Sequence, residues 1–352
     1  MRGLVTSPGL PLREALLELA YSALREGYAD FVMVPSRGPG DSYSWILAGT
    51  PDALTSAEPL PPVMTVQGAR ALSSAAGEPS SRRILAIMRP CEARAAVEVM
   101  KLRQIDHANL TLVTMDCPGV IQLDLYDGAA EPEECDPANL RPACRQCSEF
   151  TACGDACIVR SADSNLLLPL TAKGGELASS LGLEEQGSLD EWSKRTEELR
   201  ALRLGTAEGA RTELRQQVAG IGRLSDFFAD CIGCRACRTV CPICYCRQCF
   251  IDMKDRRSPA SSHLDRSRRS GAARLVSDTL LFHIGRMAHM SISCVGCGMC
   301  EDACPAGIPV GRLVSMVGAG TSALFDYRAG KDPEEPLPLN TFVEEELHEF
   351  ED

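Results

Sequence analysis

The sequence predicts two parts: an α/β N-terminal domain with a partly parallel sheet, and a helix-rich, cysteine-rich C-terminal module. Three observations support this prediction. Buried-strand and helix patterns alternate in the first third, polar helical stretches follow from about residue 188, and one cysteine pattern occurs twice in the last third of the 352 residues. We expect an α/β domain over 1–220, a module over 221–330 and an acidic tail over 331–352.

Composition and charge narrow the function classes. The 45% hydrophobic content is that of a globular protein, and the net charge of −12 disfavours non-specific binding to nucleic acid or to a membrane surface, which are themselves anionic. No stretch approaches the roughly 20 apolar residues of a membrane span, and the N-terminus shows no leader pattern. We therefore expect a cytoplasmic protein with protein partners.

The first elements follow from residue periodicity. Apolar residues at helical spacing predict a helix over 12–25 that is followed by Gly27, and a short apolar run predicts a strand over 31–34. The segment 37–82 is rich in Gly, Pro, Ser and Ala, and few elements can be placed in it.

A βαβ unit comes next. We expect a strand over 84–88, a helix over 92–104 and a second strand over 110–115. Because these strands should be parallel, Cys91 and Cys117, each just past a strand end, should lie at the same edge of the sheet.

The region after the α/β part is predicted to be helical. A capping box at 188–191 predicts a polar helix to about Leu204, and a second helix is expected near 206–218. Further on, we expect a basic, Ser-rich loop over 254–269 and an amphipathic helix over 272–290.

Two complete C-x₂-C-x₂-C-x₃-C-P runs form the most specific motif. In such pairs the first three cysteines of a run bind one [4Fe–4S] cluster and the fourth binds the other, which predicts a dicluster ferredoxin-like module. One cluster should be held by Cys231, Cys234, Cys237 and Cys304, and the second by Cys241, Cys294, Cys297 and Cys300. The alternative is a pair of zinc knuckles, which also use C-x₂-C. Disulfides are disfavoured by this tight spacing.

Four more cysteines suggest a third cluster. Cys144 and Cys147 form a C-x₂-C pair after the βαβ unit, and with Cys91 and Cys117 they make a set of four thiolates. We expect a third [4Fe–4S] cluster there. The alternative is that Cys91 and Cys117 are small buried hydrophobic residues.

The role of the other cysteines stays open. Cys244, Cys246 and Cys249 are dense enough to bind a further cluster or a structural zinc, but they lack a fourth ligand. Cys135, Cys153 or Cys157 could provide it, and the last two could instead form a redox-active pair.

Several segments resemble the beta-subunit family of coenzyme F420 hydrogenases/dehydrogenases and formate dehydrogenases. Those that carry the resemblance are Arg-Pro-Cys-Glu-Ala-Arg at 89–94, Lys-Leu-Arg-Gln at 101–104, Asp-Cys-Pro-Gly at 116–119 and Arg-Pro-Ala-Cys-Arg-Gln-Cys at 141–147. The stretches at 241–249 and 282–290 are similar to the version found beside formate dehydrogenase or heterodisulfide-reductase-like subunits. The C-terminal, split ferredoxin module departs from the family pattern.

The resemblance implies an iron–sulfur flavoprotein. In such a protein FAD exchanges two electrons with F420 or another carrier such as NAD(P)H, and the clusters pass single electrons onward. No G-x-G-x-x-G fingerprint is present, so FAD is implied by the resemblance alone. Arg89, Arg94 and Lys101 are candidate contacts for its phosphates, with ordinary salt bridges as the alternative.

We therefore expect an electron-transfer subunit of a larger oxidoreductase complex, whose partners are formate dehydrogenase, hydrogenase or heterodisulfide-reductase-like subunits. The alternatives are a flavin-free relay with several clusters and a zinc-stabilised interaction scaffold. The sequence shows no constellation of catalytic acid, base or nucleophile, so any activity would come from the cofactors.

Overall fold

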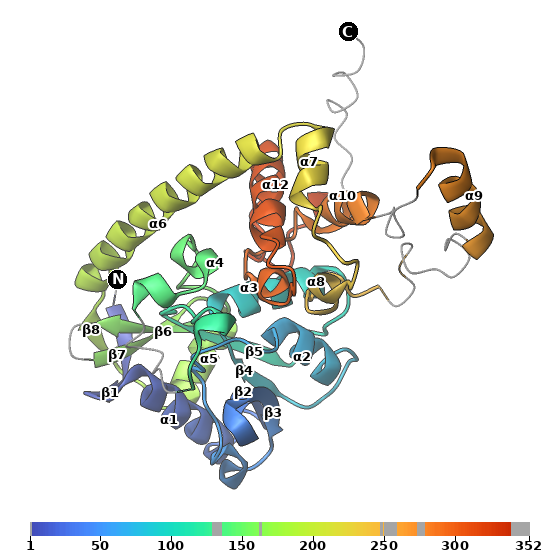
Figure 1. Cartoon of the computed structure of the whole chain (residues 1–352). Helices are drawn as coiled ribbons and strands as arrows, with labels where there is room; N and C mark the ends of the chain where they lie inside the picture. The colour runs from blue at the N-terminus through green and yellow to red at the C-terminus, as the bar shows by residue number, and fades with distance from the viewer. Residues whose placement is uncertain are drawn as a thin grey trace.

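A computed structural model shows a mixed sheet with helices on both faces and a helical module against one of them (Figure 1). The structure describes residues 2–128, 136–161, 164–246, 249, 259–272 and 279–338. In these ranges no helix is long and apolar enough to cross a membrane.

Eight strands form one sheet in the order β3-β2-β4-β5-β6-β7-β1-β8. The central strands β2, β4, β5 and β6 are parallel to one another, and the remaining pairings are antiparallel. The prediction of a partly parallel sheet is thus confirmed. The strands are β1 Arg2–Pro8, β2 Phe31–Arg37, β3 Tyr43–Ala48, β4 Ile84–Ile87, β5 Leu110–Met115, β6 Ala156–Ser161, β7 Ser164–Pro169 and β8 Glu185–Ser188.

Helices surround the sheet and form the module, with short 3₁₀ turns at Pro39–Asp41, Pro51–Leu54, Leu123–Leu125 and Pro137–Asn139. The helices of the α/β part are α1 Leu12–Arg25, α2 Gly68–Ala75, α3 Pro90–Lys101, α4 Pro142–Arg145 and α5 Ala172–Ser180. Those that follow are α6 Asp190–Gln217, α7 Ile221–Phe227, α8 Ala236–Thr239, α9 Ala260–Ser270, α10 Thr279–Met290, α11 Met299–Asp302 and α12 Val310–Leu324.

The two faces of the sheet have separate cores because successive strand residues point to opposite sides. On β2, Val32 and Val34 pack with α1 and α5, whereas Met33 packs with α2 and α3. The second core continues into the C-terminal module. The module therefore lies on the α2/α3 face of the sheet.

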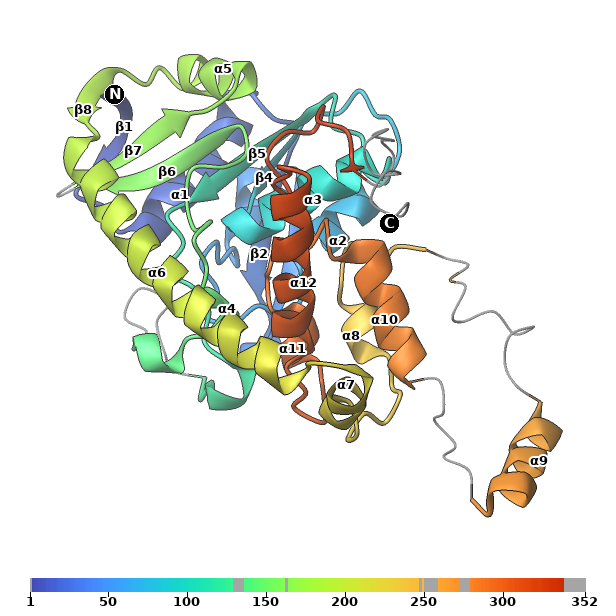
Figure 2. The same cartoon turned by 90° about the horizontal axis from the view of Figure 1, so that it is seen from above.

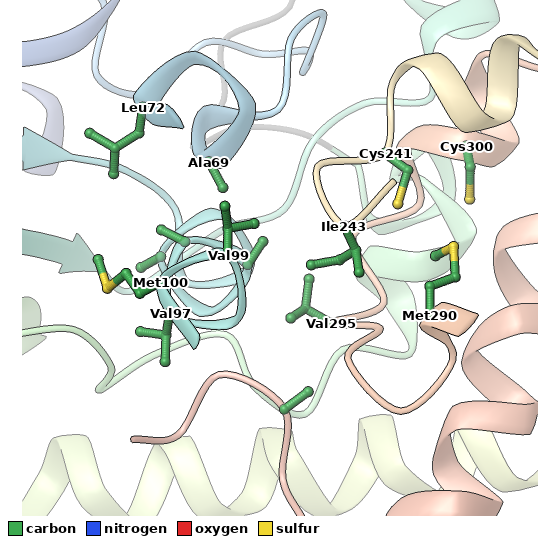
Figure 3. Close-up of a cluster of buried hydrophobic side chains, with 14 of the residues drawn as sticks. Ala69, Leu72, Val97, Val99, Met100, Cys241, Ile243, Met290, Val295 and Cys300 are labelled. Atoms are coloured by element: carbon green, nitrogen blue, oxygen red, sulfur yellow. The ribbon is translucent and has the colours of Figure 1, made fainter. Parts of the chain in front are cut away.

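Helix α3 is enclosed on all sides and forms the joint between the two parts. In Figure 3, Val99 of α3 faces Ile243 and Val295 of the module, and the sulfurs of Cys241 and Cys300 lie beyond them. Burial of this helix between sheet and module explains why Ala93, Ala95 and Ala96, small residues, occupy it.

The start of α3 has a clear local cause. Pro90 suits the first helical position, and the Glu92 carboxylate accepts a hydrogen bond from the Arg89 N–H at 3.0 Å. Both features move the helix start two residues ahead of the expected Glu92. Cys91 consequently lies in the first turn of α3 and not in a loop.

The chain after α12 is tied to α3 by buried polar contacts. Glu98, fully buried, accepts hydrogen bonds from the Tyr327 hydroxyl at 2.6 Å and from the Gly330 N–H at 2.7 Å. Lys101 donates to the Tyr327 oxygen at 2.8 Å and pairs with Glu335 at 3.5 Å. In the predicted tail, Glu335 and the buried Leu337 contact the rest of the protein, whereas 331–334 are exposed, and the part after residue 338 lies outside the described residues.

Several expectations on helices need correction. The two helices expected over 188–218 are one helix, α6, because no proline interrupts 190–217 and its glycines are tolerated. The expected capping box is absent: Ser188 Oγ accepts from Asp190 N–H, two residues on, at 3.2 Å. The expected basic loop includes helix α9, whereas β3 and α2 lie in the segment 37–82 where few elements were expected.

Replacing Tyr327 with Phe should destabilise the protein. The substitution removes the hydrogen bond to the buried Glu98 carboxylate, which should lower the free energy of unfolding by about 1–3 kcal/mol. Urea unfolding under anaerobic conditions measures this change. Tyr245→Phe, at a position 38% exposed, is the control. Equal stability of Y327F and Y245F would contradict the structural role of this contact.

Candidate iron–sulfur centres

The first predicted ligand set comes together in the module. Cys231, Cys234, Cys237 and Cys304 line one cavity, whose other walls include apolar residues such as Pro305 and Ile308. Cys304 comes from the second cysteine run, so two segments about 70 residues apart meet here, as ligand exchange between the runs requires. Four thiols around one void form a donor set suited to a [4Fe–4S] cluster.

Internal symmetry is visible in the two runs. Arg235 and Gly298 occupy the same place in their motifs, and both are left-handed, with φ of 61° and 78°, at the starts of α8 and α11. Glycine is required at 298 because a Cβ there would lie 2.6 Å from the Arg141 side chain. At the equivalent place in the first run, the Arg235 guanidinium lies over the Phe282 ring, 5.4 Å from its centroid.

The second predicted set is deeply buried. Burial raises the pKa of the Cys300 thiol well above its ordinary value, and the adjacent Cys297 and Cys294 thiols add to this effect. The hydrogen bond that the Cys241 thiol donates to Cys244, burial and the nearby Cys300 raise the pKa of Cys241 in the same way. These mutual effects place all four thiols of the set close together, where a metal cluster could stabilise them as thiolates.

The third predicted set assembles at the edge of the sheet. Cys91 in α3, Cys117 after β5, and Cys144 and Cys147 at α4 all line one cavity. The parallel pairing of β4 with β5 brings the first two to the same edge, as expected. Burial raises the pKa of Cys147 to about 12, with Cys144 as the next cause. Four buried thiols therefore face one void here as well.

The three sets form a continuous row. Cys297 belongs to the second set, yet it also lines the cavity of the third. Cys237 of the first set lies close enough to Cys300 of the second to influence its pKa. The order of the row is therefore third, second, first, running from the sheet edge into the module.

Arg141 fixes the junction between the second and third sets. Its buried side chain donates to the Cys297 carbonyl at 2.6 Å and forms an ion pair with Asp302 at 2.6 Å. Arg141 was not among the site residues predicted from the sequence. Its place three residues before Cys144 is the signal that could have identified it.

The three cations predicted to contact flavin phosphates have protein acceptors. Arg89 donates to Cys117 Sγ at 3.2 Å, to the Gly119 carbonyl at 2.8 Å and to the Pro61 carbonyl at 2.6 Å. Lys101 belongs to the contacts between α3 and the C-terminal segment. These contacts disfavour a phosphate role for both residues, because their hydrogen-bonding groups are already used inside the protein.

Arg94 differs from the other two. It donates to the Ala329 carbonyl at 3.0 and 2.7 Å, but it also lines a cavity of about 280 Å³. Cys147 of the third set and Cys294 of the second line the same cavity. Arg94 is therefore the one predicted flavin contact that faces a void beside the thiol row.

The remaining cysteines do not form one site. Cys244 contacts Cys241 and lies 3.4 Å from the Met290 sulfur, whereas Cys246 is exposed. Within the described ranges, which include Cys249, no group of three or more His, Cys, Asp or Glu residues is arranged to hold a single metal ion. This search bears on a single zinc ion and not on a cluster, so the further cluster at these three positions stays a prediction.

Cys153 and Cys157 lie next to the third set. Cys153 Sγ donates to the Pro90 carbonyl at 3.5 Å, and Cys157, on β6, is fully buried and accepts from the Ala152 N–H at 3.4 Å. Burial raises the pKa of both thiols, to about 12 and about 11. High pKa values disfavour a reactive redox pair. Cys135 lies outside the described residues.

Comparisons with known proteins agree with this geometry. A family described as "4Fe-4S dicluster domain" matches residues 227–308. The chain is 23% identical over 307 residues to the F420-dependent formate dehydrogenase subunit beta of Methanocaldococcus jannaschii, covering 74% of this chain and 77% of that subunit. The resemblance stated from the motifs is thereby confirmed.

Two further similarities are more partial. The F420-dependent formate dehydrogenase 1 subunit beta of Methanococcus maripaludis is 29% identical over 109 residues, which is 31% of this chain and 24% of that subunit. A chain of the xenon-derivatised F420-reducing [NiFe] hydrogenase complex from Methanosarcina barkeri superposes with a TM-score of 0.44 at 16% identity, covering 59% of this chain and 86% of that chain.

Replacing Cys91 with Ser should remove the third cluster alone. We expect anaerobically purified C91S protein to lose about four iron atoms per chain relative to wild type, because a [4Fe–4S] cluster needs its full ligand set. Iron and sulfide assays measure the loss. Cys157→Ser, a buried thiol outside the four, is the control. Iron content of C91S equal to that of C157S would rule out a cluster at this set.

Proposed function

Because the chain is homologous to beta subunits of F420-dependent formate dehydrogenases and contains a 4Fe-4S dicluster domain, we propose that it transfers electrons within a multi-subunit oxidoreductase complex. Its partners would be formate dehydrogenase, hydrogenase or heterodisulfide-reductase-like subunits. The domain boundaries near residues 220 and 330 and the cytoplasmic location stay predictions.

The row of three thiol sets is the observation that carries this proposal. Electrons move between clusters only when these lie close together, and shared walls between neighbouring sets meet that requirement. Twelve thiols drawn from both parts of the chain would be an unusual arrangement for structure alone. The chain's own residues would hold the clusters, exclude water from the second set and fix their spacing through Arg141.

The two ends of the row differ in their access to solvent. At the module end Cys234 is exposed, whereas Cys91 and Cys147 at the sheet edge are at least half enclosed. An exposed ligand brings a cluster near the surface, where another protein could exchange electrons with it. We therefore assign the module end to a protein partner and the sheet-edge end to a cofactor within the chain.

The cavity of about 280 Å³ is the candidate flavin site. Residues of α6 and α12, two helices labelled in Figure 2, line it, and Cys147 and Cys294 form part of its wall. Four arginines also line it, Arg94, Arg211, Arg312 and Arg328, against two glutamates, Glu149 and Glu213. Such a cationic pocket beside two ligand sets suits a redox cofactor that carries phosphates.

Of the four arginines, only Arg94 has no carboxylate partner among the described residues. Arg328 pairs with Glu149, Arg312 with Glu301 at 2.9 Å and Arg211 with Glu208 at 3.8 Å, whereas Arg94 donates to a backbone carbonyl. Burial lowers the pKa of Arg328, and the neighbouring Arg94 charge adds to this effect. An anionic ligand would relieve the repulsion between these two cations. A bound flavin would supply the conversion between two-electron and one-electron transfer.

A flavin-free relay is the second candidate, and the thiol row by itself favours it equally. It differs from the first in one property, the absence of flavin from the purified protein. A zinc-stabilised scaffold is disfavoured by the match of residues 227–308 to a 4Fe-4S dicluster domain.

Filling the cavity should release flavin and leave the iron in place. Ala210 of α6 lines the cavity, so Ala210→Phe places a ring inside it. We expect flavin absorbance per chain, measured after anaerobic purification and acid extraction, to fall at least tenfold, with iron content unchanged. The reason is steric exclusion of the isoalloxazine ring.

Ala201→Phe on the exposed side of the same helix is the matched control and should keep its flavin. Flavin retained in A210F at the level of A201F would place any flavin elsewhere. Wild-type protein with iron–sulfur absorbance and no extractable flavin would identify the flavin-free relay.

A further inference from the structure

Helix α10 presents an arginine to the first ligand set. Phe282, Arg286 and Met290 are spaced by four residues and lie on the buried side of this helix. Arg286 is only 4% exposed although it is charged. The same helix also buries His283, whose Nε2 lies 3.5 Å from Cys231 Sγ.

The guanidinium of Arg286 points at a predicted cluster ligand. Its Nη1 donates to Cys237 Sγ at 3.2 Å, and its Nη2 donates to the Cys237 carbonyl at 3.2 Å and contacts the Met290 sulfur at 3.5 Å. Its Nε is buried and has no hydrogen-bond partner among the described residues. The Nε–H of Arg286 is therefore a buried donor beside the thiols that has no acceptor among the described residues.

No carboxylate balances this charge among the residues that the structure describes. Arg141, the other arginine buried between thiol sets, forms an ion pair with Asp302 at 2.6 Å. Arg286 contacts the Cys237 thiol and carbonyl, the Met290 thioether and the Phe282 ring. Burial acts to lower the pKa of Arg286, but the neighbouring Cys237, Cys244 and Cys241 thiols outweigh it and hold that pKa above its ordinary value.

We propose that Arg286 raises the reduction potential of the ferredoxin-module clusters, and of the Cys231/Cys234/Cys237/Cys304 cluster most, so that electrons collect at the module end of the row. The inference rests on the proposed function, since it requires clusters at the predicted sets. Arg286 acts as a positioning residue: it touches the ligand Cys237 and leaves the ligand set complete.

The physical reason is charge. Reduction adds one electron to a cluster and therefore one negative charge, with no bond formed or broken at the ligands. A buried cation that donates to a ligand sulfur stabilises the more negative state, and water cannot screen it there. Hydrogen bonds to the sulfurs and net charge are established determinants of cluster potential. Arg286 contributes a hydrogen bond and a positive charge at the same sulfur, Cys237 Sγ.

An anaerobic redox titration of the purified full-length protein, followed by electron paramagnetic resonance, tests the proposal. Dithionite supplies the electron in each reduction step. We expect R286Q to retain its iron and to show one component whose reduced-to-oxidised ratio, at the wild-type midpoint, falls at least tenfold, or 59 mV for one electron. Arg215→Gln, which removes an exposed charge on α6, is the control and should leave every component unchanged.

A second pair of variants tests the charge without removing Arg286. Met290→Glu places a carboxylate next to Arg286 Nη2, where the Met290 sulfur now lies, and should lower the midpoint potential of the same component. Met290→Gln, of the same shape without the charge, should not. This pair also decides the question if R286Q fails to assemble its clusters.

Each outcome has a defined meaning. A lower midpoint potential in R286Q and in M290E, but not in M290Q and R215Q, supports the proposal. Full iron content with unchanged midpoints in R286Q, or in M290E where R286Q does not assemble, overturns the role of Arg286 and leaves the proposed function intact. Wild-type protein without iron–sulfur clusters overturns both.

Discussion

The contact of Arg141 with the second cysteine run determines how the two parts of the chain fit together. Its buried guanidinium, from the residue just before α4, is held by Asp302 and the Cys297 carbonyl, both from the module. The same contact leaves no room for a side chain at Gly298. Breaking a buried pair of this kind costs about 3–5 kcal/mol, because a charge would remain without a partner. The spacing between the second and third thiol sets therefore depends on one ion pair.

Burial of the thiols couples cluster binding to folding. Burial raises the pKa of Cys91 and of Cys300 well above the ordinary value, so without metal these groups are neutral. A cluster binds these groups as thiolates, and ligation by its iron atoms stabilises the negative charge that water cannot reach to stabilise. Arg89 and Arg286, which donate to Cys117 and Cys237, compensate part of the charge that ligation creates. The protein thus prepares its interior for anionic centres with cations.

Local spacing and strand topology were the predictable parts. The cysteine runs showed the ferredoxin pair from sequence alone, and parallel strands predicted that Cys91 and Cys117 would meet. Arg286 and Arg141 were missed because their importance arises from tertiary contacts with thiols far away in sequence. The sequence did offer a signal for Arg286, because it is a charged residue on the apolar face of an amphipathic helix. The cavity between α6 and α12 could not be predicted, because it depends on how two distant helices diverge.

Helix α6 connects the α/β part of the chain to the C-terminal module. It spans about 42 Å at the usual rise per residue, with Trp192 in the core beside β6 and β7 and Leu214 in the core of the module. Between these anchors it covers the cavity, so its position sets the width of that cavity. A ligand bound there would contact both parts of the chain. Binding at the cavity and the fit between sheet and module are therefore linked through the same helix, which gives a cofactor a structural role beside its chemical one.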